Sequence, residues 1–310
     1  MILKALFEKI PAVLCQGSWD TDIASILMCS KEVTNNSLFI CIRGMEQDGH
    51  QYIQEAAKRG AAACLVEEDF WQQMISVDED REPPDQMISA HRDWKIPEKI
   101  TIVSVKNTRE AAAWAAAAFY RYPSKELKVI GITGTKGKTS TTFMIRDILE
   151  AAGYKTGLLG TIDYEIGEEK KRAERTTPEA IDIQRYLRKM ADSGCRFAVM
   201  EVSSQGLKLH RSDGILFDVG VFTNLGRDHI GPKEHKDMAE YAHYKSLLFQ
   251  KCCFGIGNID DPYYREIFKD ASCQVSTYSC RQKADVQASD IMLVNRNGQL
   301  GTFFKLNGEE

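Results

Sequence analysis

The sequence predicts an α/β protein in which a small mixed α/β domain precedes a larger domain built on a parallel sheet. Its 310 residues are enough for roughly two domains of ordinary size. Apolar residues account for 43% and charged residues for 27%, which is typical of a folded, soluble protein and not of a disordered one. From residue 127 onward, short apolar runs alternate with helical patterns, as they do in a parallel sheet with crossover helices.

Charge and apolar patterning exclude several classes of protein. Forty basic and 44 acidic residues leave a net charge of −4, so no excess positive field exists to hold a nucleic acid. The longest apolar run, residues 111–120, is about half of the ~20 residues that a membrane-spanning helix needs, and the charged N-terminal segment does not resemble a secretory signal. Nine scattered cysteines without a CxxC pair encode neither a zinc site nor a disulfide framework. The sequence predicts a cytoplasmic protein without a nucleic-acid partner or membrane insertion.

The first domain is expected over residues 1–106. Successive patterns predict a helix within residues 1–10, a strand at 37–43, a helix at 52–60 and strands at 64–66 and 100–105. Residues 70–99 mix acidic groups, two adjacent prolines and other polar residues without a period, which predicts an inserted surface segment.

An alanine-rich helix over residues 107–126 is expected to join the two domains. Asn107 followed three residues later by Glu110 matches a capping box, which satisfies the free amides at a helix start. Pro123 then stops the helix, because proline cannot continue the ladder of backbone hydrogen bonds.

The second domain, residues 127–310, has the rhythm of a parallel α/β core. Its patterns predict strands at 129–133, 156–160, 197–201, 219–223 and 254–258, helices at 140–152, 178–193, 238–250 and 263–269, and a hairpin with strands at 291–294 and 301–306 around Asn297-Gly298.

A glycine-rich loop between the first strand and helix of this domain predicts a phosphate site. The segment GITGTKGKTS, residues 131–140, places glycines at 131, 134 and 137, a variant spacing of the usual phosphate loop. Backbone amides at a helix start can surround phosphate oxygens while Lys138 neutralises their charge. A plain glycine turn is the alternative, but the order of strand, loop, Gly-Lys-Thr and helix favours a bound nucleoside triphosphate. The residues expected to hold it are Gly134, Thr135, Lys136, Gly137, Lys138, Thr139 and Ser140.

Magnesium is expected beside the triphosphate, because a hard cation bridges phosphates with help from a hydroxyl and one or two carboxylates. Thr139 supplies a hydroxyl, and Glu201 ends an apolar strand at the edge of the sheet where open α/β folds bind ligands. A solvent-facing strand end is an equal alternative for Glu201. His229 follows another strand and is a candidate for a second ion, although an isolated histidine is more often an ordinary loop residue.

Five motifs taken together resemble the Mur ligases. In order they are GITGTKGKTS, RTTPEAIDIQ, VMEVSSQGLKLHR, FTNLGRDH and YAHYKSLLF. The likeness is greatest to the MurE branch, which adds the third residue to the UDP-N-acetylmuramoyl dipeptide in peptidoglycan synthesis. Residues 37–68 resemble the uridine-nucleotide domain of that branch, so the likeness spans nearly the whole chain outside 70–99. The resemblance implies a domain that binds UDP-N-acetylmuramate, followed by a central ATPase domain.

The implied activity is ATP-dependent amide ligation. The γ-phosphoryl group passes to a carboxylate of UDP-N-acetylmuramoyl-L-Ala-D-Glu, and the amine of an amino acid attacks the acyl phosphate. By resemblance, Lys138, Glu201, His229 and Lys245 are catalytic. Thr139 and Glu201 would hold one Mg²⁺, while Glu201, His229 and a carbamylated Lys245 would bear on another. From sequence alone an exposed helix lysine is the simpler interpretation of Lys245, and the motif reverses that preference.

The resemblance also implies substrate contacts. The residues expected at the muramoyl peptide are Thr176, Thr177, Ser203 and Arg211, those at the uridine nucleotide are Ser30, Met45, Glu46 and Gln47, and Asn258 is expected at the adenine of ATP. Alternatives are that Thr177 caps a helix and that Arg211 is an ordinary surface charge. The segment IGPKEHKD after His229, with two extra residues, departs from the commonest form of the branch, as does Gln205 in place of a histidine.

The family ends in a third domain that selects the amino acid, whereas this chain stops at Glu310. The expectation is a fragment, or a natural short form, that binds ATP but ligates poorly or not at all alone. One alternative is an ATP-binding module without catalysis that acts through a partner. Another is a relative of folylpolyglutamate or cyanophycin synthetase, which the uridine-type first domain argues against. A kinase or GTPase would leave that domain unexplained.

Overall fold

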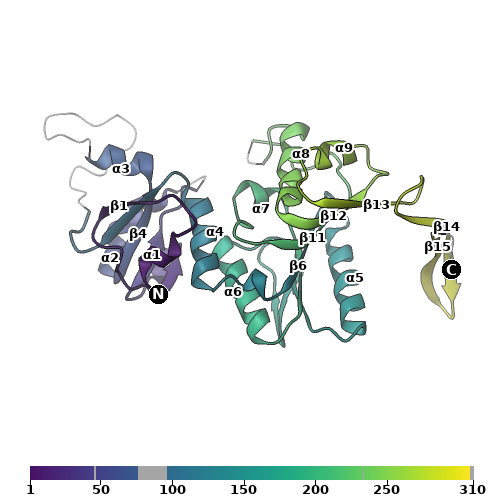
Figure 1. Cartoon of the computed structure of the whole chain (residues 1–310), viewed down its shortest axis with the longest axis horizontal. Coiled ribbons are helices and arrows are strands. Elements are labelled where there is room, and N and C mark those ends of the chain that lie inside the picture. Colours follow the sequence, from purple (N-terminus) through teal and green to yellow (C-terminus); the bar gives the residue numbers. More distant parts are fainter. Residues whose placement is uncertain (45–46, 76–95, 233, 308–310) are drawn as a thin grey trace. The chain divides into compact units, whose positions relative to one another are not determined.

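The structure, a computed structural model, describes residues 1–44, 47–75, 96–232 and 234–307 (Figure 1). The chain folds as two compact units, one from Met1 to Arg121 and the other from Tyr122 onward. Both units place helices against sheets of mainly parallel strands, which confirms the predicted α/β class. In the described residues, no helix combines the length and apolar character that crossing a membrane would require.

The first unit contains a five-stranded sheet in the order β1-β5-β4-β3-β2. Strands β2 to β5 are parallel, and β1 pairs antiparallel with β5 at one edge. The elements are α1 (Leu3–Leu6), β1 (Val13–Gln16), β2 (Ser25–Leu27), η1 (Ser30–Glu32), β3 (Ser37–Ile40), η2 (Gly49–Tyr52), α2 (Ile53–Lys58), β4 (Ala61–Glu67), α3 (Glu68–Ile75), β5 (Thr101–Val105) and α4 (Thr108–Phe119).

Two predictions for this unit need correction. Helix α3 occupies the start of the expected 70–99 insertion, of which residues 76–95 lie outside the described part of the chain. The alanine-rich helix is α4, capped by the Asn107 side chain as expected, but it ends at Phe119 inside the first unit and does not run to 126. Arg121 and Tyr122 both adopt positive φ, which breaks the helix before Pro123 starts a short 3-10 turn.

The second unit contains a ten-stranded sheet in the order β15-β14-β13-β12-β11-β6-β10-β7-β8-β9. The strands from β14 to β7 are parallel, whereas β15, β8 and β9 join antiparallel at the edges. The strands are β6 (Lys128–Thr133), β7 (Thr156–Leu159), β8 (Asp163–Ile166), β9 (Glu169–Arg172), β10 (Phe197–Glu201), β11 (Phe217–Phe222), β12 (Cys252–Asn258), β13 (Gln274–Ser279), β14 (Val286–Arg296) and β15 (Gln299–Leu306).

Helices cover both faces of this sheet. The helical elements are η3 (Pro123–Lys125), α5 (Lys138–Ala151), α6 (Ala180–Asp192), α7 (Ser204–Lys208), α8 (Met238–Ser246), η4 (Leu247–Gln250) and α9 (Tyr264–Phe268). Ile145 and Leu149 of α5 pack on one face, against Ile132, Val199 and Val221. The larger core lies on the other face and includes side chains from α6, α7, α8, η4 and α9.

Most of the predicted elements of this unit are confirmed, with shifted ends. Helix α5 begins at Lys138, two residues earlier than predicted, and the C-terminal hairpin is longer, with Asn297 and Gly298 both at positive φ in its turn (Figure 1). The predictions missed β8, β9, β13 and α7. Gly131, counted in the glycine loop, lies within β6, where an added Cβ would come 2.8 Å from the Phe217 ring.

The strand order sets the position of the site. Strand β6 lies between β10 and β11, with Ile132 opposite Glu201 and Thr133 opposite Phe222. The carboxyl ends of these three parallel strands therefore meet at one edge of the sheet, where the glycine loop leaves β6.

Candidate functional site

The glycine loop connects β6 to α5 in a backbone conformation that requires glycine twice. Gly134 has φ +150°, and an added Cβ would lie 1.9 Å from Thr223 Oγ1. Gly137 has φ +84° and is the N-cap residue of α5. Since both values lie where other residues are strained, these two glycines determine the shape of the loop.

The end of β11 holds this loop by hydrogen bonds. Thr223 Oγ1 donates to Lys136 O at 2.7 Å, and the Asn224 amide pairs with both the N–H and the C=O of Lys136, at 2.9 and 3.1 Å. Thr135 N donates to Asn224 O at 2.8 Å. Thr223 and Asn224 were not among the predicted site residues, and the available signal was their place in the FTNLGRDH motif, at the end of a predicted strand.

Lys138 is the first residue of α5 and its ammonium turns back over the loop. Its Nζ donates to Gly134 O at 2.8 Å and to Thr135 O at 3.2 Å. Burial lowers the pKa of this ammonium group, and the nearby Glu201 carboxylate opposes that effect. Lys136, by contrast, points to the surface, where its Nζ pairs with Asp228 at 2.9 Å, and the Ser140 side chain is exposed.

Glu201 is not a solvent-facing strand end, because only 1% of the residue is exposed. Its Oε2 accepts hydrogen bonds from Thr139 Oγ1 at 3.1 Å and Thr161 Oγ1 at 3.0 Å, and its Oε1 accepts one from Thr161 N at 2.8 Å. The site thus contains a buried carboxylate in contact with the hydroxyl expected to bind magnesium. Thr161 lies in the turn between β7 and β8 and had no motif to mark it.

Lys245 on α8 is also buried, with 1% exposed, so the exposed-lysine alternative is wrong. Its Nζ donates to Gly134 O at 2.9 Å and lies 4.6 Å from the centre of the Tyr241 ring. Lys138 donates to the same carbonyl oxygen. Burial first, and then the positive charge of Lys138, hold the pKa of Lys245 well below its usual value.

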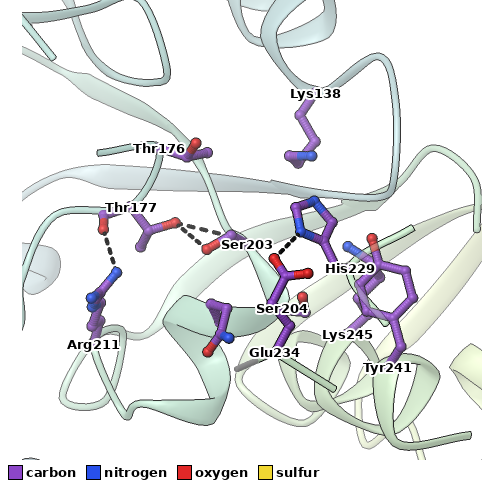
Figure 2. Close-up of a pocket in the computed structure, with 11 residues that line it drawn as sticks. Lys138, Thr176, Thr177, Ser203, Ser204, Arg211, His229, Glu234, Tyr241 and Lys245 are labelled. Atoms are coloured by element: carbon purple, nitrogen blue, oxygen red, sulfur yellow. Dashed lines mark hydrogen bonds and ion pairs between the residues drawn. The ribbon is translucent and has the colours of Figure 1, made fainter. Parts of the chain in front are cut away.

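One pocket of the second unit gathers seven of the predicted site residues (Figure 2). It offers about 210 Å³ of space for water-sized molecules. The predicted residues in its lining are Lys138, Thr176, Thr177, Ser203, Arg211, His229 and Lys245, and those that the sequence analysis did not assign to the site are Ser204, Gln205, Glu234 and Tyr241. In Figure 2, Thr177 and Arg211 stand at one side and Lys245 with Tyr241 at the other.

The wall of this pocket on the side of Thr177 is a chain of hydrogen bonds. Thr177 Oγ1 contacts Ser203 Oγ and Glu201 O, each at 3.0 Å, and accepts from Ser203 N at 3.0 Å. Arg211 donates to Thr177 O at 3.2 Å and forms a bidentate pair with Glu179. Glu179, not Thr177, is the N-cap residue of α6, so the capping alternative for Thr177 is wrong.

His229 stands on the pocket wall with φ +56°, and its Nδ1 lies 2.7 Å from Glu234 Oε1. Within the described residues, no three or more His, Cys, Asp or Glu side chains cluster as they would around a metal ion. Of the four expected metal-binding residues, Thr139 and Glu201 form a pair of oxygen donors. His229 is paired with Glu234, and Lys245 as an amine offers no oxygen.

The remaining predicted residues lie outside the pocket. Asn258 ends β12, where its Nδ2 donates to Thr223 O at 2.8 Å, so it contacts the residue that holds the glycine loop. In the first unit, Ser30 is buried and donates to Glu55 at 2.9 Å, and Gln47 accepts from the Tyr52 hydroxyl at 3.3 Å. Met45 and Glu46 lie outside the described residues.

Comparison with known proteins gives consistent matches. The model of the Mur ligase middle domain matches residues 132–310, and that of the Mur ligase family, catalytic domain, matches residues 22–120. The UDP-N-acetylmuramoyl-L-alanyl-D-glutamate–2,6-diaminopimelate ligase of Clostridium tetani is 38% identical over 310 residues, which cover 100% of this chain and 59% of that protein. The ligase of the same name from Bacillus licheniformis is 38% identical over 299 residues, covering 94% and 55%.

A solved structure with that ligase name superposes with a TM-score of 0.75 at 22% sequence identity, over 99% of this chain and 57% of the other. The likeness extends through both units of the fold. The chain spans less than two thirds of the length of the curated relatives that it matches.

Proposed function

The chain belongs to the Mur ligase family, and we propose that it forms the part of a ligase that binds ATP and a UDP-N-acetylmuramoyl dipeptide. In the proposed reaction, the γ-phosphoryl group of ATP passes to a carboxylate of UDP-N-acetylmuramoyl-L-alanyl-D-glutamate. The amine of an amino acid then attacks the acyl phosphate, so that an amide bond forms and phosphate leaves. The names of the relatives support 2,6-diaminopimelate as that amino acid.

The observation that carries this proposal is the pocket itself. Two lysine side chains, Lys138 and Lys245, meet at Gly134 O on one side, and Thr177, Ser203 and Arg211 form the other side. A carboxylate and a triphosphate repel each other, so their reaction needs cations that are in place before charge moves. Fixed side chains in a confined pocket also supply the alignment of the two reacting groups.

Magnesium suits one part of this site. The Thr139 hydroxyl and the buried Glu201 carboxylate are the hard oxygen donors that Mg²⁺ prefers, and they would hold an ion next to the loop that receives the phosphates. When bound, the ion would neutralise charge on the phosphoryl oxygens. We propose that His229 and a modified Lys245 would bind the second ion.

We propose that Lys245 becomes that ligand by carbamylation. Carbon dioxide adds only to a neutral amine: the nitrogen lone pair forms the new N–C bond, and a proton leaves the nitrogen for solvent. The product is an anion with two oxygens in place of a cation. The lowered pKa of Lys245 supports this step, because it raises the fraction of neutral amine at physiological pH.

Calorimetric titration tests the ATP part of the proposal. The chain should bind Mg-ATP, and Lys138→Met should weaken binding by about tenfold or more, as expected for a lost charge-assisted contact to phosphate. Lys106→Met, a lysine of the first unit, is the control for the loss of one positive charge. Absence of binding by folded wild-type protein would contradict the proposal.

Phosphate release tests the ligase part. UDP-N-acetylmuramoyl-L-alanyl-D-glutamate should bind to the chain and stimulate the release of phosphate from ATP. Tight ATP binding without binding of the dipeptide or stimulation by it would instead support a nucleotide-binding module that does not catalyse. The contacts of Asn258 to adenine, and of Ser30 and Gln47 to uridine, stay predictions.

A further inference from the structure

The segment that follows His229 contains a buried histidine that contacts a residue of the pocket lining. His235 is completely buried, and its Nε2 lies 2.8 Å from the Oγ of Ser204, a residue of the pocket lining. This histidine belongs to the segment IGPKEHKD, in which the sequence departs from the commonest form of the branch. The proposed reaction assigns no role to His235 or to Ser204.

The backbone of His235 also closes the turn that carries His229 and Glu234. His235 N donates to His229 O at 3.1 Å, and Gly231 N donates to His235 O at 2.9 Å. Lys208 of α7 adds a second connection, because its Nζ donates to Glu234 O at 2.8 Å. His235 therefore joins this turn to Ser204, the first residue of α7.

The imidazole ring is held on its faces and has one strong polar contact. It packs between Tyr241 and Tyr244, with ring centres 5.1 and 5.6 Å away. In the described part of the chain Nδ1 has no hydrogen-bond partner, and Glu240 Oε2 lies 3.9 Å from it. Burial, with a contribution from Lys208, lowers the pKa of His235, so the ring is neutral and carries one N–H.

Ser204 connects this histidine to the pocket wall that contains the hydroxyl groups of Ser203 and Thr177. It follows Ser203, whose Oγ accepts from Gly206 N at 3.0 Å and contacts Thr177 Oγ1 at 3.0 Å. A shift of Ser204 would therefore move the start of α7 and with it Ser203 and Thr177. The phosphate loop is held mainly by Thr223 and Asn224. Tyr241, which packs against the His235 ring, also contacts the loop, with its hydroxyl 3.2 Å from Thr135 Oγ1.

We propose that His235 is a positioning residue that fixes the Ser204 hydroxyl and thereby aligns the wall that receives the acidic muramoyl substrate. Its contacts hold the turn that carries His229 and the start of α7 in one position relative to each other. The ligand in this inference rests on the proposed function, whereas the coupling between Ser204 and the turn does not.

A double-mutant cycle with His235→Phe and Ser204→Ala tests the inference. His235→Phe keeps an aromatic ring between the two tyrosines and removes both nitrogens. It should weaken binding of UDP-N-acetylmuramoyl-L-alanyl-D-glutamate by about tenfold while the Kd for Mg-ATP stays within about twofold. Ser204→Ala should add little further loss in the His235→Phe background, because both changes break one contact. His235→Gln, which restores a polar group near Ser204, should recover part of the affinity.

Amide hydrogen exchange supplies a readout that needs no ligand. Ser204→Ala should accelerate exchange of the Gly231 amide across the contact, and His235→Phe should accelerate exchange of the Gly206 amide. His243→Phe, which changes an exposed histidine of α8, is the matched control and should alter neither amide.

Additive losses of dipeptide affinity, equal losses for dipeptide and Mg-ATP, or unchanged Gly231 exchange in Ser204→Ala would each overturn the role of His235. If the wild-type chain binds no dipeptide, the proposed function fails, and the exchange experiment still decides whether His235 and Ser204 are coupled.

Discussion

At the scale of single residues, the site depends on two lysine side chains that share one carbonyl oxygen. Lys138 and Lys245 both donate to Gly134 O, and burial lowers the pKa of both. The pKa of Lys245 falls further because the charge of Lys138 is close. Of the two ammonium groups, Lys245 therefore loses its proton more readily, and carbamylation of Lys245 requires the neutral amine.

Lys245→Ala should abolish a carbamate signal and lower the rate of the reaction. With ¹³C-labelled bicarbonate, the wild-type chain should show a carbamate resonance that Lys245→Ala lacks. Dipeptide-dependent phosphate release should fall by about a hundredfold, because the charge stabilisation at the transferred group is lost. Acetate or added bicarbonate should partly restore it. Lys236→Ala, an exposed lysine, is the control, and full activity of Lys245→Ala without additive would contradict the role.

The lowered pKa of Lys245 also predicts how stability depends on pH. Between the folded pKa and the ordinary value of 10.5, the unfolded chain binds more protons at this group, so the free energy of unfolding rises with pH. Lys245→Met removes this dependence. In carbon dioxide-free buffer the stability advantage of Lys245→Met over wild type should be largest near neutral pH and shrink toward pH 10. Urea titrations at several pH values measure it, and a constant difference would show that the pKa is not lowered.

At the scale of elements, the end of β11 sets the conformation of the glycine loop before any ligand arrives. Thr223 and Asn224 form hydrogen bonds to the backbone of Lys136, and Asn258 at the end of β12 contacts Thr223 O. Two strand ends that are distant from the loop in sequence thereby define the backbone position of Thr135 and Lys136. A loop that is already in place loses little conformational entropy when phosphate binds.

Gly134→Ala tests this arrangement, with Gly153→Ala as a matched control. Both glycines have positive φ, +150° and +85°, but a Cβ at 134 would clash with Thr223 Oγ1, whereas nothing lies within 4 Å of one at 153. Gly153→Ala should cost only the strain of the backbone, about 1–2 kcal/mol of unfolding free energy. Gly134→Ala should cost more and abolish Mg-ATP binding. Chemical denaturation and calorimetry measure the two effects, and equal results for both variants would contradict the role of Thr223.

At the scale of the whole molecule, the two units divide the predicted site residues between them. The phosphate loop, Glu201, Lys245 and the pocket belong to the second unit, whereas Ser30 and Gln47 belong to the first. Every contact of the glycine loop that is described above lies within the second unit. Mg-ATP should therefore stabilise that unit directly.

Scanning calorimetry of the full chain tests this division. At a concentration of Mg-ATP about 100 times Kd, a unit that binds it gains about 2.7 kcal/mol, which corresponds to a rise in melting temperature of roughly 5–10 °C for a unit of this size. Lys138→Met should lose this shift. If ATP raises the transition of residues 1–121 instead, the assignment of the nucleotide to the second unit is wrong. Tryptophan fluorescence reports that transition, because all four tryptophans of the chain lie in this range.

The local elements were largely predictable from the sequence, because their signals act over a few residues. The Asn107 cap, the glycine loop and the Asn297-Gly298 turn are all where the patterns indicated. Of the missed strands, β1, β2, β8 and β9 have three or four residues each, too short for a period to show, whereas β13 has six. Some predicted element ends were shifted, as for α4, which ends at Phe119 before the positive φ values of Arg121 and Tyr122.

The sequence by itself determined which functional groups are available: a phosphate loop with Lys138, an acid at the end of a strand, and the lysine and hydroxyl motifs of a ligase family. Only the tertiary structure decided which of these groups meet. Thr139 and Glu201 are 62 residues apart and Lys245 and Gly134 are 111 apart, yet each pair is in contact. The physical reason is the order of strands β11, β6 and β10, which brings their carboxyl ends to one edge of the sheet, where Thr161 contacts Glu201 and Thr223 contacts the glycine loop.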